Sequence, residues 1–231
     1  MAADTPSNDK LEESIKTLIK AAQEDQELEL EVRVGVIDKD GKFSPGVTRE
    51  RFESVANILS ISKYGWTSVS DWEDSRDYVT HDSLRLTTTH QGKRMAMKKI
   101  LHSRMDVRPV FGGDISSDIV VRFSAKKEVH VPLTTTALPS NIKTVRAKRR
   151  KTFTDSMWQY DLTGVYQADS EESLAQNQPD PIFEIELEVG QAKWDRSKTT
   201  DDITQSLLAK TQDIVRQLLL VDELPYFEII E

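Results

Sequence analysis

The chain has 231 residues, of which 37% are apolar and 30% are charged, so it is long enough for one substantial domain with some charge inside it. Its formal net charge of −8 argues against a protein that coats nucleic acid non-specifically, and the lack of cysteine excludes disulfide scaffolds and thiolate metal sites. No apolar run approaches the roughly 18 residues of a membrane-spanning helix, so no membrane segment is expected.

Amphipathic helices are expected near both ends of the chain and after its first strand. Residues 1–9 are polar and are predicted to form a disordered tail, and residues 10–231 are predicted to form a single domain. Apolar residues at helical spacing predict a helix over 10–25, and Thr48 as an N-cap predicts a second helix over 48–59. A third helix, over 201–220, has the same apolar period and closes the domain.

Short runs of β-branched and polar residues, separated by turns, predict a middle region that is rich in strands. Residues 169–180 contain many Ser, Gln and acidic residues and predict an exposed loop. Together the elements predict a mainly β protein of the α+β class, with an antiparallel β-barrel or strongly curved sheet and helices packed outside it. The expected strands cover residues 27–37, 77–80, 83–89, 94–100, 119–123, 145–153, 159–165 and 183–189.

Two of these strands have the same unusual layout. Residues 29–33 (Glu-Leu-Glu-Val-Arg) and 184–188 (Glu-Ile-Glu-Leu-Glu) place charges on alternate positions, with aliphatic residues between them. Alternate side chains of a strand share one face, so each strand is predicted to be apolar outside and acidic inside. A face of carboxylates repels itself unless a cation lies against it, and a divalent metal is a hard cation that prefers several oxygen ligands.

A third strand has the complementary charge. Arg146, Lys148 and Arg150 occupy alternate positions, so one face of this strand is wholly basic. Further charged or hydroxyl side chains occur in strand-like surroundings at Arg85, Arg122, Glu128, Asp161 and Thr163.

These faces predict a specific chemistry if all of them look inward. Burying charge without compensation costs several kcal/mol per ion, so such an interior must be hydrated, cross-paired or filled by a ligand. The acids would hold a metal and the bases a polyphosphate, because the planar fork of arginine binds two phosphate oxygens at once. A glutamate that does not bind the metal could orient or deprotonate an attacking water. The pattern therefore indicates an enzyme of phosphoryl transfer.

Simpler interpretations exist for each motif alone. A single Glu-x-Glu strand is usually a solvated face of a sheet, and the run over 146–151 alone fits a nuclear localisation or RNA-docking segment. The four histidines have no paired ligand spacing, which disfavours zinc. Two acidic strands and one fully basic strand in the same chain favour the charged interior.

Taken together, the motifs resemble a known family, the metal-dependent RNA 5′-triphosphatases of mRNA capping, which belong to the triphosphate tunnel metalloenzymes. Their order and approximate spacing match from about residue 27 to 189, and the short chain looks more like the protozoan enzymes than the longer fungal ones. The resemblance implies a closed eight-stranded antiparallel β-barrel with the charged faces lining a triphosphate tunnel. It is carried by the first strand with Gly35-Val36-Ile37, by Arg85, by the 122–128 strand, by Arg146-x-Lys148-x-Arg150, by Asp161-Leu162-Thr163 and by Glu184-x-Glu186-x-Glu188.

The resemblance also implies a role for each matching residue. Glu29, Glu31 and Glu188 would bind Mn²⁺ or Mg²⁺. The catalytic residues would be Glu186, Asp161, Arg146, Lys148 and Arg150. The phosphate-binding residues would be Arg33, Arg85, Lys98, Arg122, Arg146, Lys148 and Arg150, with Lys98 chosen over the adjacent Lys99. Glu128, Thr163 and Glu184 would support them. One position departs from the pattern, because Gln159 stands where the best-known fungal forms carry a base.

The function implied is hydrolysis of the γ-phosphate of triphosphate-ended pre-mRNA, the first step of capping, with manganese-dependent cleavage of free NTPs as a further activity. Partners would be triphosphate-ended RNA and a capping guanylyltransferase, the chain being a monomer or homodimer in the nucleus, or in the cytoplasm if viral. The alternatives are a tunnel phosphohydrolase acting on inorganic triphosphate, thiamine triphosphate or NTPs, and a non-catalytic module that binds RNA or polyphosphate.

Overall fold

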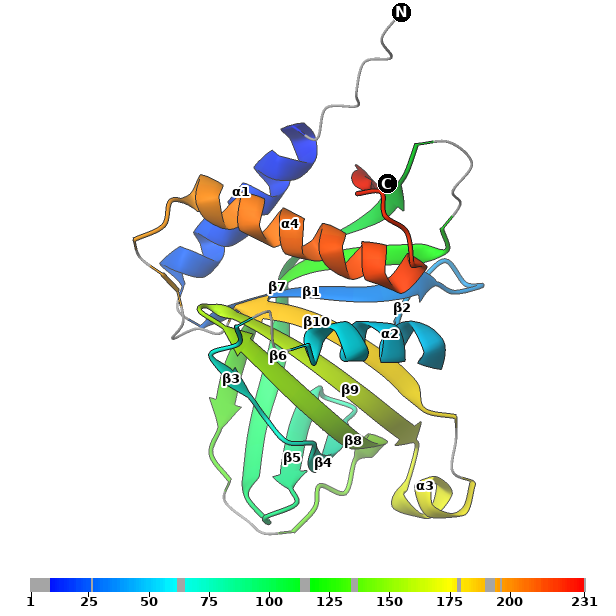
Figure 1. Cartoon of the computed structure of the whole chain (residues 1–231). Helices are drawn as coiled ribbons and strands as arrows, with labels where there is room; N and C mark the ends of the chain where they lie inside the picture. Colours follow the sequence, from blue (N-terminus) through cyan, green and yellow to red (C-terminus); the bar gives the residue numbers. More distant parts are fainter. Residues whose placement is uncertain are drawn as a thin grey trace, which may run out of the picture.

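The computed structural model describes residues 9–25, 27–61, 65–112, 117–133, 137–177, 180–189, 194–195 and 197–230 (Figure 1). The tail predicted over residues 1–9 lies outside the described residues, except for Asp9, which begins the first helix. The helices are α1 (Asp9–Glu24), α2 (Arg49–Leu59), α3 (Glu171–Asn177) and α4 (Thr200–Leu219). The strands are β1 (Leu28–Ile37), β2 (Phe43–Pro45), β3 (Ser68–Val69), β4 (Glu73–Thr80), β5 (Leu84–Thr89), β6 (Arg94–Val110), β7 (Ile119–Val131), β8 (Ile142–Asp155), β9 (Trp158–Ala168), β10 (Ile182–Val189) and β11 (Tyr226–Ile229).

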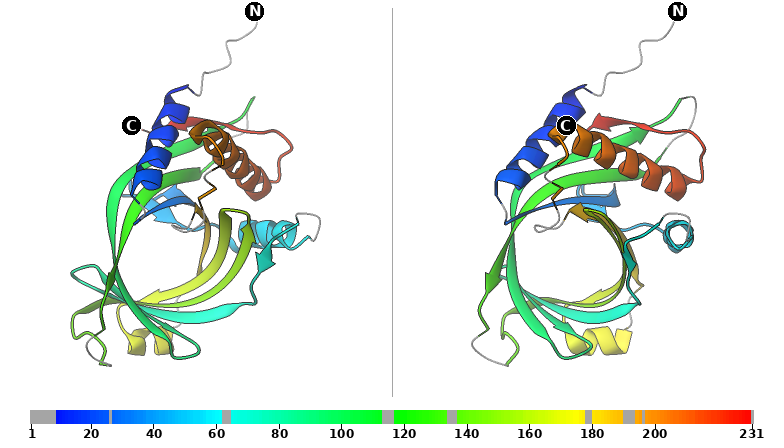
Figure 2. Two further views of the ribbon diagram at one scale, coloured as in Figure 1. Left: turned by 90° about the vertical axis from the view of Figure 1, so that its left-hand side faces the viewer. Right: turned by 60° about the vertical axis from the view of Figure 1, so that its left-hand side comes forward.

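Eight of the strands close into an antiparallel barrel, which confirms the predicted fold. The ring runs β10–β9–β8–β4–β5–β6–β7–β1 and is closed by pairing between β1 and β10. The short strands β2, β3 and β11 lie outside the ring and pair with β1, β8 and β6. Figure 2 looks toward one open end of the barrel, around which the ring of strands can be followed.

The main hydrophobic core lies between one outer wall of the barrel and the helices. Leu30 and Val32 on β1 are almost fully buried, and they belong to the same cluster as Ile15 of α1 and Leu207 and Val215 of α4. Figure 2 shows α1 and α4 together above this wall. The apolar residues of the alternating strands are therefore sealed under helices, which leaves the charged residues between them to face the barrel interior.

The helices begin where the sequence predicts them. Thr48 caps α2 and accepts a hydrogen bond from the Arg51 backbone N–H. Thr199 and Asp202 form a capping box at the start of α4, in which each side chain accepts a hydrogen bond from the other residue's backbone N–H. No described helix is long and apolar enough to cross a membrane.

The sequence predictions are wrong in extent for two long strands and in type for one loop. The strand expected to end at residue 100 continues as β6 to Val110. The strand expected over 119–123, which the resemblance extended to residue 128, continues as β7 to Val131. The two strands pair with a register shift between Leu101 and Ser103. The loop predicted over 169–180 contains helix α3. That helix has a single buried anchor, Leu174, which belongs to an outer cluster with Tyr78 and Val145, so local periodicity alone gives no helical signal.

Candidate active site

A charged cavity of about 640 Å³ lies inside the barrel. The lining residues include seven carboxylates against five Lys and Arg side chains, so the cavity as a whole carries excess negative charge. The carboxylates are Glu29, Asp71, Glu73, Asp74, Glu128, Glu186 and Glu188, and the basic residues are Arg33, Arg85, Lys99, Lys148 and Arg150. The mouth is bordered by the segment 71–75 before and within β4 and by residues 89–91 at the end of β5.

The acidic wall is built by the pairing of β1 with β10. Glu31 lies directly opposite Glu188, and Arg33 lies opposite Glu186. Directly opposed side chains on neighbouring strands have Cβ atoms about 4.5–5.5 Å apart, so this register brings the two acidic faces together. Glu31 and Glu186 are only 1% and 3% exposed, so their charges need partners inside the protein.

Arg33 and Arg150 supply the first of these partners. The Arg33 guanidinium forms ion pairs with both Glu31 and Glu186. Arg150 pairs with Asp161 and with Glu186, at 3.1 Å from the latter, and its Nε donates to Thr163 Oγ1 at 3.0 Å. Burial opposes ionisation of Glu186, but Arg33 and Arg150 outweigh it and hold the pKa of this carboxyl well below its usual range.

The basic wall is built by β8 together with β4 and β5. Lys148 and Arg150 line the cavity from β8, and Arg85 lines it from β5. Asp77 of β4 is fully buried between them, with its Oδ2 2.8 Å from Lys148 Nζ and 3.9 Å from Arg85 Nε. Burial raises the pKa of Asp77, but Lys148 and Arg85 outweigh it and hold the pKa below its ordinary value. Asp77 therefore stays ionised and fixes the positions of two cations.

The structure corrects the lysine chosen from the sequence. Lys98 lies on the outer face of β6, where its side chain is 40% exposed and forms an ion pair with Asp82 at 3.1 Å. Lys99 lines the cavity instead, with its Nζ 2.7 Å from Glu29 and 2.6 Å from Glu128. Burial opposes its charge, but Glu29 and Glu128 outweigh the burial and raise the pKa of Lys99. The physical reason is register, because Lys99 pairs with the inward-facing Glu128 of β7.

Two further charged residues of the site, Asp77 and Lys126, were not predicted from the sequence. Asp77 belongs to a segment read only as a short strand, and its partners lie on other strands. Lys126 of β7 holds both carboxylate oxygens of Glu31, at 3.0 and 2.9 Å. The period-2 phase shared by Arg122, Lys126 and Glu128 is the one signal that could have indicated Lys126.

Two predicted phosphate-binding arginines are placed away from the cavity lining. Arg146 is buried and donates to Glu184 Oε1 at 2.6 Å. Arg122 forms a bidentate pair with Asp106, at 2.6 and 2.7 Å, and its guanidinium lies 4.2 Å from the centroid of the Phe43 ring. Among the described residues, neither arginine belongs to the cavity lining. Thr163 and Glu184 are likewise not among the residues that line it.

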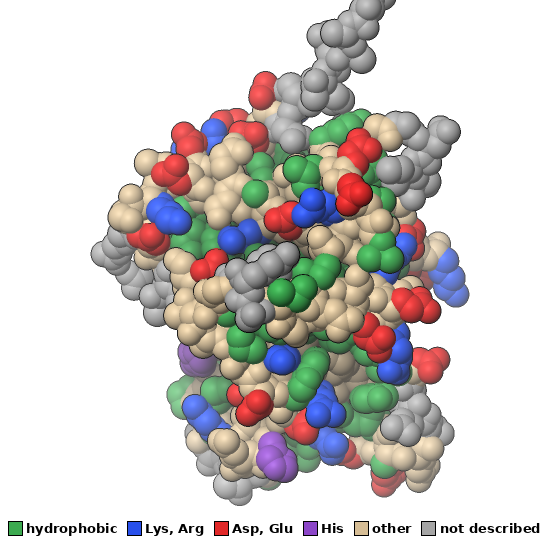
Figure 3. Space-filling view, in the orientation of Figure 1, with side chains coloured by type: hydrophobic (Ala, Val, Ile, Leu, Met, Phe, Trp, Pro, Cys, Tyr) green, Lys and Arg blue, Asp and Glu red, His purple; other side chains and the backbone are tan. Residues whose placement is uncertain are grey.

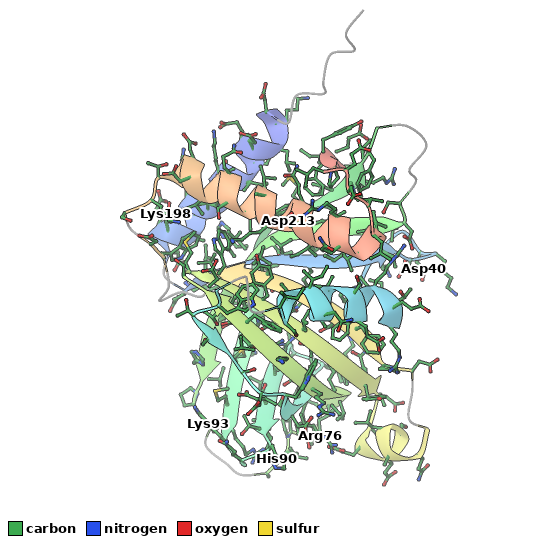
Figure 4. All side chains as sticks on the ribbon, viewed as in Figure 1. Asp40, Arg76, His90, Lys93, Lys198 and Asp213 are labelled. Atoms are coloured by element: carbon green, nitrogen blue, oxygen red, sulfur yellow. The ribbon has the colours of Figure 1, made fainter. Side chains whose placement is uncertain are left out.

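Strand β2 packs over the end of β1 nearest Arg122. Gly35 is in phase with Glu31 and Arg33, and a Cβ there would meet the backbone oxygen of Ser44 and lie 2.9 Å from the Phe43 ring. Glycine therefore lets Phe43 pack against the inner face of β1. The Asp38–Asp40 turn that leads into β2 lies at the opposite side of the molecule from the Lys93 turn, as the labels for Asp40 and Lys93 in Figure 4 show.

Comparison with solved structures finds proteins with the same fold. The S. pombe Pct1 RNA triphosphatase has a TM-score of 0.69 at 13% sequence identity, covering 90% of this chain and 93% of that chain. The same enzyme in complex with the Spt5 CTD gives 0.67 at 14%, covering 90% and 92%. A mimivirus capping enzyme triphosphatase gives 0.61 at 12%, covering 93% and 100%. No model of a known protein family matches the sequence, and no curated protein matches it.

The chain has the triphosphate tunnel fold. At 12–14% identity the likeness establishes the architecture, and the chemistry has to be argued from this chain's own residues. The charged cavity described above is the interior of the tunnel, with carboxylates from β1 and β10 on one wall and cations from β5 and β8 on the other.

The tunnel carboxylates fit a divalent cation by their chemistry. Burial, followed by the negative charges of Glu29, Asp161 and Glu186, raises the pKa of Glu188 well above its ordinary value, so an additional cation would relieve this site. Gln159 donates a hydrogen bond to Glu188 at 2.6 Å but brings no positive charge to it. Glu31 is held by Lys126 and Arg33, and within the described residues no three acids or histidines already converge on one metal position. Glu188 therefore fits the cation as it stands, whereas Glu29 would first have to release Lys99 and Glu31 would have to release Lys126.

Proposed function

We propose that this chain is an RNA 5′-triphosphatase that hydrolyses the γ-phosphate of triphosphate-ended RNA, leaving diphosphate-ended RNA and orthophosphate. The observation that carries the proposal is the enclosed tunnel in which Glu29, Glu186 and Glu188 face Arg85, Lys148 and Arg150. A wall of acids suits a divalent cation and a wall of bases suits a polyphosphate, which is the pair of ligands that phosphoryl transfer needs.

The basic residues bind and orient the triphosphate. Arg85, Lys99, Lys148 and Arg150 donate to phosphate oxygens, where they stabilise the charge that develops as the P–O bond breaks. Asp77 is a positioning residue, because it holds Lys148 and Arg85 without lining the tunnel itself. Arg146, buried against Glu184, acts in the same way by holding a residue of the acidic strand β10.

The acidic residues orient the attacking water. Glu186 is kept ionised by Arg33 and Arg150, so it accepts a hydrogen bond from the water and directs its lone pair toward the γ-phosphorus. Asp161 accepts from Thr152 at 2.6 Å and pairs with Arg150, which fixes Arg150 beside the phosphate. Glu29, Glu31 and Glu188 would hold Mn²⁺ or Mg²⁺, which offsets charge on the terminal phosphate when bound.

The test is a comparison of three substrates under one set of conditions. Phosphate release is measured from triphosphate-ended RNA, ATP and inorganic tripolyphosphate, each with manganese, with magnesium and with a chelator. The proposal predicts metal-dependent release from RNA at a kcat/KM above that for tripolyphosphate. Preference for tripolyphosphate or thiamine triphosphate would assign the chain to another tunnel phosphohydrolase. Binding of RNA without phosphate release under any metal would make it a binding module.

The likeness to an RNA triphosphatase and to a capping enzyme triphosphatase supports placing this activity at the first step of mRNA capping. A guanylyltransferase then uses the diphosphate end, so such an enzyme is the proposed partner, with the nucleus as the proposed location, or the cytoplasm for a viral chain. Tagged protein, expressed in cells, tests the location by imaging and the partner by co-purification of guanylyltransferase activity.

A further inference from the structure

A second depression, of about 510 Å³, lies on the outside of the barrel beside the tunnel mouth. We call it the outer groove. Its lining includes Arg76 and Tyr78 of β4, Ala147 and Arg149 of β8 and Tyr166 of β9. The outward register explains this set, because Arg76 lies opposite Ala147, and Ala147 lies opposite Tyr166. The tunnel and the outer groove are thus on opposite faces of the same wall.

The outer groove is continuous with the tunnel mouth. Asp74, Ser75, Thr89, His90 and Lys148 line both cavities, at the edge of the barrel where β4 begins and β5 ends. Figure 4 labels Arg76 and His90 at this side of the barrel, away from α1 and α4. A chain whose end is held in the tunnel can therefore leave over this edge and continue along the outer groove.

The lining of the outer groove combines positive charge with aromatic and small residues. Arg149 is exposed, and its guanidinium lies 5.7 Å from the centroid of the Trp72 ring, which lines the tunnel mouth. Opposite Arg149 on β9 is Gly164, where a Cβ would meet nothing within 4 Å. Ala147 and Gly164 thus leave a shallow floor next to Tyr166, onto which a flat ring could stack.

The charges along the outer groove favour a polyanionic ligand. Asp71 and Glu73 make the mouth acidic, and Asp74 lies opposite Arg149 on the neighbouring strand, so a phosphate chain is attracted only by the cations of the outer groove. Arg149 is one of these cations, and Arg76 is the other, paired at 2.6 Å with Glu171 in an exposed ion pair that exchanges readily for phosphate. Figure 3 shows acidic and basic side chains interspersed on the face it presents, without a broad basic surface. RNA that leaves the tunnel therefore needs a local row of cations to bind to.

We propose that the outer groove binds the single-stranded RNA downstream of the triphosphate end, with Arg149 and Arg76 contacting its backbone and Tyr166 stacking on an unpaired base. The proposal rests on the proposed function, since it is the tunnel that fixes the 5′ end. Arg149 and Tyr166 are binding residues for the body of the RNA and have no contact with the triphosphate, so they set the affinity for RNA over short phosphate substrates.

The test compares RNA with tripolyphosphate in Arg149→Glu and Tyr166→Ala variants of the full chain. Steady-state kinetics are measured on a ten-nucleotide triphosphate RNA and on inorganic tripolyphosphate at several salt concentrations. Arg149→Glu is expected to raise KM for RNA by about tenfold, and its KM should depend less steeply on salt, with a slope lower by about 1. Tyr166→Ala is expected to raise KM for RNA about fivefold. KM for tripolyphosphate and kcat on both substrates should stay within twofold of wild type.

The matched control is Arg104→Glu, which reverses the charge of an exposed arginine on β6 that lines neither the tunnel nor the outer groove. It should leave both substrates unchanged. Equal effects of Arg104→Glu and Arg149→Glu on RNA, an unchanged KM for RNA in both groove variants, or equal changes for RNA and tripolyphosphate would overturn the groove proposal. An unchanged KM for RNA is also the result expected if the outer groove docks a peptide. By contrast, wild-type protein that cleaves tripolyphosphate but not RNA would refute the proposed function itself.

Discussion

The charged residues of the tunnel are held in place by each other, so the effect of changing one depends on which partner it leaves behind. Lys99 bridges Glu29 and Glu128, whereas its neighbour Lys98 pairs on the surface with Asp82. The two lysines are adjacent in the chain and carry the same charge, but they lie on opposite faces of β6. Comparing variants of the two lysines therefore tests whether a lysine must lie inside the tunnel to contribute to phosphate release.

We expect Lys99→Ala to lower kcat for phosphate release by about 100-fold, as removal of one preorganised donor typically does. Lys98→Ala should stay within about twofold of wild type, because an exposed ion pair contributes little. Single-turnover assays on triphosphate RNA make the comparison. Equal losses in the two variants would contradict the assignment of Lys99 to the tunnel.

The buried pair of Arg146 and Glu184 allows a test of structural support separate from chemistry. Arg146→Ala leaves Glu184 without its partner and should lower the free energy of unfolding by about 3–5 kcal/mol. Replacing both residues together, as Arg146→Met with Glu184→Leu, should restore most of that stability because no unpaired charge remains. Denaturant unfolding gives both values. A double variant as unstable as the single one would show that the pair does more than neutralise itself.

At the scale of the elements, the tunnel depends on how β2 packs against β1. Gly35→Ala would place a methyl group against the Ser44 carbonyl and the Phe43 ring, and we expect a loss of about 1–3 kcal/mol in unfolding free energy from overpacking. Gly164→Ala in β9 is the control, because the added methyl meets nothing within 4 Å, and it should be neutral or stabilising by up to about 1 kcal/mol. The same loss in both variants would contradict the close approach of β2.

The strands also show which features of the site can be predicted from the sequence. The alternating charges of β1, β8 and β10 predict the tunnel directly, since a period of two is visible in the residues themselves. The choice of Lys99 over Lys98 required the pairing of β6 with β7, which is not encoded locally. Asp77 and α3 were not found because their partners come from distant segments, such as Glu171 of α3 with Arg76 and Tyr78 of β4.

At the scale of the whole molecule, the closed barrel concentrates negative charge that a bound cation would offset. Glu188→Gln removes one of several neighbouring carboxylates, so the metal-free protein should become more stable by about 1 kcal/mol, or roughly 2–4 °C in Tm. Manganese at about 100 times its Kd should stabilise the wild type by about 2.7 kcal/mol and the variant much less. Thermal unfolding with and without manganese measures both effects.

The control for that experiment is Glu53→Gln, at an exposed position on α2, which should behave as wild type in both conditions. If manganese stabilised Glu188→Gln as strongly as wild type, Glu188 would not be a ligand. A metal-free variant less stable than wild type would contradict the inference that repulsion among the carboxylates around Glu188 destabilises the protein.

We propose that the carboxylates and cations within this one barrel act together on a terminal phosphate. This joint action is tested most directly by phosphate release from γ-labelled triphosphate RNA, comparing wild type with Glu188→Gln, each with manganese and with a chelator. We predict rapid release by the wild type with manganese, none with the chelator, and a loss of at least about 100-fold in the variant although it remains folded. Equal rates for the wild type and the variant, or release that is unaffected by the chelator, would contradict it.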